Sequence, residues 1–81
     1  MNARTKLLQS LRNNPRDRRI EDLLSLARHF GIECRNHGGS HHVFSAEGVE
    51  QDVTVPAHRP IKPVYVRQFL ALIECVLEVR K

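Results

Sequence analysis

The fold class follows from residues 31–56, which read GIECRNHGGSHHVFSAEGVEQDVTVP. In three short parts of this run apolar and polar side chains alternate, and a period of two is typical of β-strands. We expect strands over residues 32–37, 40–46 and 51–55, with glycine turns between them. Because the connections are short, neighbouring strands pair with each other, and the pattern predicts a three-stranded antiparallel sheet.

Two helical segments precede the predicted sheet. Leucines at helical spacing predict a first helix over residues 5–14, which Pro15 ends. A second helix is expected to open near Asp17 or Arg18, with Asp17 as its N-cap. It is expected to stop at Gly31, which stands where a left-handed residue commonly ends a helix. Its predicted apolar stripe consists of Ile20, Leu23, Leu24, Ala27 and Phe30.

A third helix follows the sheet and runs from Pro63 to the C-terminus. Proline fits the first position of a helix, because its missing N–H would have no partner there anyway. The predicted apolar stripe of this helix consists of Val66, Phe69, Leu70, Ile73, Val76 and Leu77. The whole order is α-α-β-β-β-α, which predicts an α+β fold with the helices packed on one face of the sheet.

Length, charge and cysteine content narrow the classes of function. The chain has 81 residues, a length that predicts one domain over residues 1–81. Its net charge of +4 predicts a polyanionic partner, either nucleic acid or an acidic protein surface. The thin core of so short a chain does not favour a pocket for a large cofactor. Two cysteines do not make a disulfide framework, and no stretch approaches the length of a membrane helix. We therefore expect a cytoplasmic protein with reduced thiols, without a cofactor and without a membrane partner.

Histidines are concentrated in the predicted sheet and its loops, and the densest stretch is Gly38-Gly39-Ser40-His41-His42. A histidine at the start of a strand is held on a rigid scaffold near solvent, and its imidazole exchanges protons near neutral pH. His41 and His42 should point to opposite faces of the sheet, so at most one of them belongs to a given site. A plain structural role, as polar turn and strand residues, stays open for both.

A metal site is the second interpretation of the same region. Cys34, His37, His41 and His42 together look like a Cys/His cluster. The spacing lacks a paired Cys-x-x-Cys, however, and the two adjacent histidines diverge. A small metal-binding interaction domain is therefore an alternative that the spacing does not favour, and we expect no bound metal.

Basic residues surround the histidines in the sequence. His58 and Lys62 lie in the loop after the third predicted strand. If the sheet brings this loop beside the first hairpin, they can flank a phosphate near His41. From the residues alone, a plain connecting loop with a solvated histidine is the favoured interpretation. Arginines can track a phosphate backbone, because Lys and Arg contacts supply affinity that does not depend on sequence. They can equally form a solvated helix face or a docking patch for an acidic protein. The candidate RNA-binding arginines are Arg16, Arg18, Arg19, Arg35, Arg59 and Arg67.

Three motifs then follow one another along the chain. They are Gly39-Ser40-His41-His42-Val43-Phe44, Val53-Thr54-Val55-Pro56-Ala57-His58, and Ile61-Lys62-Pro63 before the last helix. Their order and spacing, over residues 20–73, resemble the HicA family of bacterial toxins, which are small ribonucleases of toxin–antitoxin pairs with a double-stranded-RNA-binding-like fold. The resemblance implies that His41 carries the activity, and it matches Ser40, His58 and Lys62 to the family's motifs as possible helpers or phosphate contacts.

The resemblance implies a metal-independent mRNA endoribonuclease, neutralised by an antitoxin of the HicB type. The family's shortest members begin with the helix equivalent to residues 18–30, so this chain adds a helix over residues 5–14 to a core over residues 18–79. Only Lys62 and Arg67 stand near the start of the last helix, whereas double-stranded-RNA-binding modules have a lysine-rich start there. A non-catalytic RNA-binding module of the same fold is the remaining alternative.

Overall fold

The computed structural model describes residues 3–36 and 38–80, which form three helices and three strands. The helices are α1 (Ala3–Asn13), α2 (Ile20–Phe30) and α3 (Pro63–Val79). The strands are β1 (Glu33–Arg35), β2 (His41–Ser45) and β3 (Val53–Pro56), and they form one antiparallel sheet in the order β1-β2-β3. This arrangement confirms the predicted α+β fold and its α-α-β-β-β-α order.

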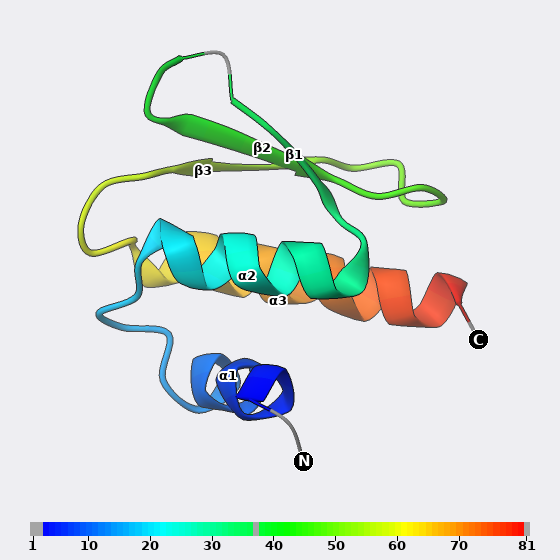
Figure 1. Ribbon diagram of the computed structural model, residues 1–81, viewed down its shortest axis with the longest axis horizontal. Coiled ribbons are helices and arrows are strands. Elements are labelled where there is room, and N and C mark those ends of the chain that lie inside the picture. Colours follow the sequence, from blue (N-terminus) through cyan, green and yellow to red (C-terminus); the bar gives the residue numbers. More distant parts are fainter. Residues whose placement is uncertain (1–2, 37, 81) are drawn as a thin grey trace.

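The elements are stacked in layers (Figure 1). Helices α2 and α3 lie next to each other under one face of the sheet, and α1 packs against both of them on the side away from the sheet. No helix of the described residues covers the opposite face of the sheet. This face is therefore open to solvent along all three strands.

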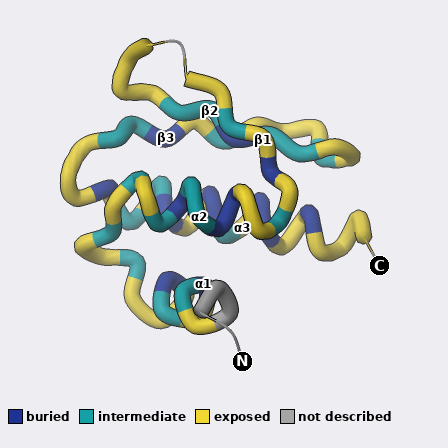
Figure 2. Tube along the Cα trace, in the orientation of Figure 1, coloured by how far each residue is buried: buried dark blue, intermediate teal, exposed yellow. Residues whose placement is uncertain are grey.

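The hydrophobic core lies between the sheet and the helices, where Figure 2 shows the buried residues. Phe44 of β2 and Phe69 of α3 are both fully buried, and their rings meet edge to face with centroids 4.9 Å apart. Such aromatic pairs add about 0.5–1.5 kcal/mol to the gain from burial alone. Leu11 is fully buried too, so the additional helix α1 is part of the core rather than an appendage.

The strands differ from their predicted bounds at their ends. The first strand is shorter than predicted, because the Ile32 N–H donates to the Ala27 carbonyl (2.8 Å) and so belongs to the end of α2. His37, which was predicted as its last residue, lies outside the described residues. The third strand begins at Val53 and includes Pro56, which is tolerated because β3 is an edge strand.

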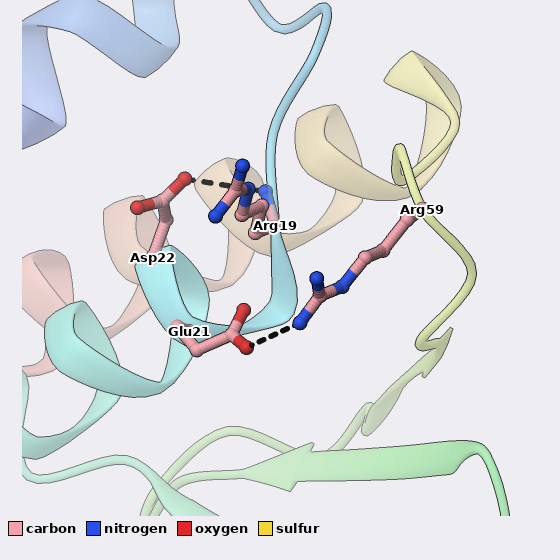
Figure 3. A network of polar contacts seen from close by, with 4 residues as sticks. All are labelled: Arg19, Glu21, Asp22 and Arg59. Atoms are coloured by element: carbon pink, nitrogen blue, oxygen red, sulfur yellow. Dashed lines mark hydrogen bonds and ion pairs between the residues drawn. The ribbon is translucent and has the colours of Figure 1, made fainter.

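Asp17 is not the N-cap of α2, which is a correction to the prediction. It has a left-handed backbone (φ 57°), a conformation that aspartate tolerates better than most residues. The next residue, Arg18, is held in an isolated antiparallel bridge to Ile61, so the chain is still extended there. The helix therefore starts two residues later, with Arg19 as N-cap, and the Asp22 carboxylate accepts the Arg19 backbone N–H at 3.2 Å (Figure 3).

The end of α2 and the start of α3 follow the prediction. Gly31 is left-handed (φ 69°) and follows the last residue of α2, and Pro63 is the first residue of α3. The apolar stripes were predicted less completely. Leu26 and Leu72 are buried although the predicted stripes omitted them. Leu77 is 40% exposed, since the last turns of α3 extend beyond α2 (Figure 1).

Candidate functional site

His41 is the first residue of β2, and its side chain belongs to the open face of the sheet. The strand register shows this, because His42 pairs with the fully buried Val55 and so faces the helices. His41 pairs with Pro56 and points the other way, as alternation requires. It is exposed, whereas His42 is only partly so. A substrate can therefore reach His41 without displacing any described element.

The turn before His41 is organised by Asn36, which is not among the residues predicted for the site. Its Oδ1 accepts the Gly38 N–H at 2.8 Å, and its Nδ2 donates to the Gly39 carbonyl at 3.0 Å. The same Nδ2 lies 3.1 Å from Nε2 of His42, which accepts this hydrogen bond in one tautomer. The sequence contains a signal for this turn, since an asparagine two residues before a glycine is typical of an Asx turn, in which the asparagine side chain hydrogen-bonds to the backbone two residues further on.

The loop after β3 lies at the same end of the sheet as His41. The Ala57 N–H donates to the Ser40 carbonyl at 2.6 Å, which joins this loop to the residue before His41. His58 follows directly and is exposed, as is Ser40. The far end of the loop is anchored by Ile61, which is buried and donates its N–H to the Arg18 carbonyl at 2.9 Å.

Lys62 lies at the start of α3 as its N-cap residue and is exposed. The first turn of α3 contains no acidic side chain, so the lysine adds to the partial positive charge that the helix dipole places there. Arg67 is exposed about one turn further along the helix. These two cations and His58 come from one short stretch of chain, and they form the basic part of the candidate site.

The other candidate arginines do not form one patch. The Arg18 guanidinium donates hydrogen bonds to Ser10 of α1, with Nη2 2.7 Å from Ser10 Oγ and 3.2 Å from the Ser10 carbonyl oxygen. Its Nε also donates to the carbonyl oxygen of Asn14, just after α1, at 3.0 Å. These hydrogen bonds give Arg18 a structural role, and its assignment as an RNA contact stays a prediction. Arg16 and Arg19 are exposed on the linker before α2.

Two further arginines are held in exposed ion pairs. Arg59 pairs with Glu21 at 3.1 Å (Figure 3), and Arg35 pairs with Asp52 at 3.2 Å. Exposed pairs of this kind contribute about 0–1 kcal/mol, so a phosphate can replace the carboxylate at little cost. Arg35 pairs with Val43 across the strands, which places it on the open face one step along from His41.

The residues of the alternative metal cluster do not converge. Cys34 pairs with Phe44 on the helix-facing side of the sheet, whereas His41 belongs to the other side. Burial raises the pKa of the Cys34 thiol, which disfavours the thiolate that metals and nucleophilic chemistry require. His37 lies outside the described residues, and within them no three His, Cys, Asp or Glu side chains are grouped so as to hold a metal ion.

Comparison with known proteins places this arrangement in a family. A family model described as the HicA toxin of bacterial toxin–antitoxin systems matches residues 20–74, which is more than half of the chain. The chain belongs to the HicA toxin family. The match begins at the first residue of α2, so α1 precedes the part that HicA toxins share.

Two other comparisons found nothing similar to this HicA family member, either among curated proteins or among solved structures. The HicA match covers β2, the loop after β3 and the start of α3, so all of the candidate site except Arg16, Arg18 and Arg19 lies within it. Across the described residues, no helix is both long and apolar enough to cross a membrane.

Proposed function

We propose that this HicA family toxin is a metal-independent endoribonuclease that cleaves mRNA in the cytoplasm, with His41 as its catalytic residue. The observation that carries the proposal is the position of His41, exposed on the open sheet face beside the basic loop after β3. A flexible RNA strand can lie on this face with a phosphate near the loop. The family match adds that proteins of this kind act as toxins.

The reaction that this site suits is attack by the ribose 2′-oxygen on the neighbouring phosphorus. The 2′-hydroxyl loses its proton, the bond between phosphorus and the 5′-oxygen breaks, and that oxygen takes up a proton. The products are a 2′,3′-cyclic phosphate and a 5′-hydroxyl. His41 transfers one of the two protons, as base for the 2′-hydroxyl or as acid for the 5′-oxygen, and such a group typically contributes about 10²–10⁴ in rate.

The negative charge that builds up on the phosphate needs a cationic partner. Lys62 stands at the positive end of α3, and His58 and Arg59 lie on the loop that connects it to β3. Because the nucleophile is the RNA's own hydroxyl, a metal ion is not needed to generate it. Ser40 helps to fix the loop through its carbonyl, and its hydroxyl is a possible phosphate contact.

We also propose that a HicB-type antitoxin neutralises the toxin by covering His41. The open face of the sheet supports this proposal, since no helix of the described chain lies over it and a partner has free access. Covering one exposed side chain is an economical way to inhibit so small a protein.

Controlled expression in bacteria tests the proposal. The wild-type protein is expected to stop growth, His41→Ala to permit it, and co-expression of the cognate antitoxin to restore growth to the wild type. Purified wild-type protein with a metal chelator should cut a transcript but not the same strand with 2′-deoxyribose at the cut site. Salt-sensitive RNA binding without any cleavage would instead identify a non-catalytic binding module.

A further inference from the structure

A groove lies on the molecule away from the loop after β3, between the β2–β3 turn and the second half of α3. It has a volume of about 800 Å³. Residues 48–53 form one wall, and residues of α3 from Gln68 to Val79 form the other. The groove takes no part in the proposed RNA cleavage, because His41 belongs to the outer face of the sheet and begins β2, whereas this turn follows its end.

One end of the groove is closed by contact between the turn and the helix. Gly48 has a left-handed backbone (φ 85°), and a Cβ atom there would lie 2.9 Å from Cγ1 of Val79. Glycine suits this position, because another residue would be strained at this φ and its Cβ would press on Val79. The wall formed by the turn is therefore fixed against the helix, and the groove is a feature of the folded protein rather than a gap between loose segments.

The chemistry of the groove is apolar with an acidic rim. Val49, Val53 and Leu72 supply apolar surface, while Glu50, Asp52 and Glu78 supply carboxylates. Among the residues that the structure describes, no lysine or arginine lines it, although the chain as a whole carries an excess of cations. Asp52 is already paired with Arg35, so Glu50 is the carboxylate best placed to meet a new cation. The complementary ligand is apolar on one side and cationic on the other.

The wall of the groove also includes the start of an edge strand. β3 pairs only with β2, so the other side of its backbone has no strand neighbour in the described chain. An added strand commonly binds such an edge through main-chain hydrogen bonds, with alternate side chains filling pockets. From Gln68 to Val79 the helix rises about 16 Å, which matches about five residues of extended chain.

We propose that this groove docks an extended segment of a protein partner, about five residues long, in which apolar side chains alternate with Lys or Arg. The apolar side chains enter the groove over Val53 and Leu72, and the cations face Glu50 and the other rim carboxylates. Because the groove lies apart from His41, a partner bound there leaves the proposed cleavage site open.

A defined peptide tests the proposal. The probe is an end-capped, fluorescently labelled peptide of eight residues with alternating lysine and valine, and its counterpart alternates glutamate and valine. At physiological salt, fluorescence anisotropy should show saturable binding of the lysine peptide only. Saturating lysine peptide should also slow alkylation of Cys75, which lines the groove and is exposed, but leave Cys34 unaffected.

Two matched variants test whether the lysine peptide binds in the groove. Glu50→Lys should weaken binding about fivefold or more, since it turns an attraction into a repulsion. Glu47→Lys makes the same change in the same turn but outside the groove, and should change the affinity less than twofold. His41→Ala should bind the peptide as well as the wild type, so the proposal can succeed even if His41 has no role in cleavage.

Three results would overturn the proposal. They are equal binding of the two peptides, equal weakening by Glu50→Lys and Glu47→Lys, and undiminished alkylation of Cys75 under saturating lysine peptide. Absence of binding up to millimolar peptide would overturn it as well. Circular dichroism of both variants ensures that any loss of binding comes from the groove rather than from unfolding.

Discussion

Asn36 holds the turn that leads into β2, and the position of His41 depends on it. Two of its hydrogen bonds fix the backbone at Gly38 and Gly39, and a third contact reaches His42. Each hydrogen bond of this kind contributes about 1 kcal/mol. At the scale of single residues, Asn36 therefore fixes the backbone that leads into His41.

We expect Asn36→Ala to lower kcat for RNA cleavage about tenfold with little change in KM, because loss of roughly 1.4 kcal/mol of positioning affects the reacting geometry more than the binding. The matched control is Asn14→Ala. Asn14 closes a similar turn, with Oδ1 3.1 Å from the Arg16 N–H, but in the linker before α2. Equal effects of the two substitutions on kcat would contradict a positioning role.

The close approach of Gly48 to α3 makes a stability prediction. Gly48→Ala is expected to destabilise the fold by about 1–3 kcal/mol, since alanine is strained at positive φ and its Cβ meets Val79. Gly39→Ala is the control, because a Cβ there meets nothing within 4 Å, and it should change the free energy of unfolding by no more than about 0.5 kcal/mol. Urea denaturation measures both values.

At the scale of elements, Arg18 connects the end of α1 with the loop that precedes α3. Its side chain binds the end of α1, and its carbonyl accepts the Ile61 N–H from the loop that precedes α3. α1 is thereby tied to the loop that carries His58. The additional helix is thus connected to the candidate site through Arg18, although it lies outside the family match.

We expect Arg18→Ala to destabilise the protein by about 1–2 kcal/mol, because it removes two hydrogen bonds to Ser10 of α1 and one to Asn14 just after this helix. Hydrogen exchange should show the loss first in the amides of α1. Arg16→Ala removes an exposed guanidinium from the same linker and should cost no more than about 0.5 kcal/mol. A larger loss of unfolding free energy for Arg16→Ala than for Arg18→Ala would refute the structural role of Arg18 in holding α1.

The order of the elements could be predicted from the sequence because the period of the apolar residues changes at the helix and strand borders. Local signals also placed Gly31 and Pro63, since both act through their own backbone. Asp17 was assigned wrongly because the chain is still extended at the next residue, where Arg18 forms a bridge to Ile61 in a distant part of the chain. The partners of Arg18, Arg35 and Arg59 and the groove beside α3 depend in the same way on tertiary packing.

At the scale of the whole molecule, charge is unevenly distributed. His58, Arg59 and Lys62 are grouped in the loop after β3, whereas Glu47, Glu50 and Asp52 are grouped in the turn between β2 and β3. The net charge of +4 is therefore the sum over a basic loop after β3, an acidic groove and the remaining charges of the chain. We expect RNA to bind at the first and a cationic protein segment at the second.

The salt dependence of RNA binding tests this distribution. Lys62→Gln should weaken binding of single-stranded RNA and reduce the slope of log affinity against log salt concentration by about 0.7, the value for one phosphate contact. Arg28→Gln removes an exposed cation from the last turn of α2, far along the chain from the loop, and should leave the slope unchanged. Equal changes in slope would indicate diffuse attraction by net charge instead of a contact at Lys62.

The most direct test of the central claim is the cleavage rate of one defined RNA by purified protein in the presence of a metal chelator. We predict that His41→Ala lowers this rate by about 10²–10⁴, and that His42→Ala, which changes the neighbouring imidazole on the helix-facing side, lowers it far less. The cleaved ends should be a 2′,3′-cyclic phosphate and a 5′-hydroxyl. A His41→Ala protein that remains folded and cuts this RNA at the wild-type rate would contradict the account.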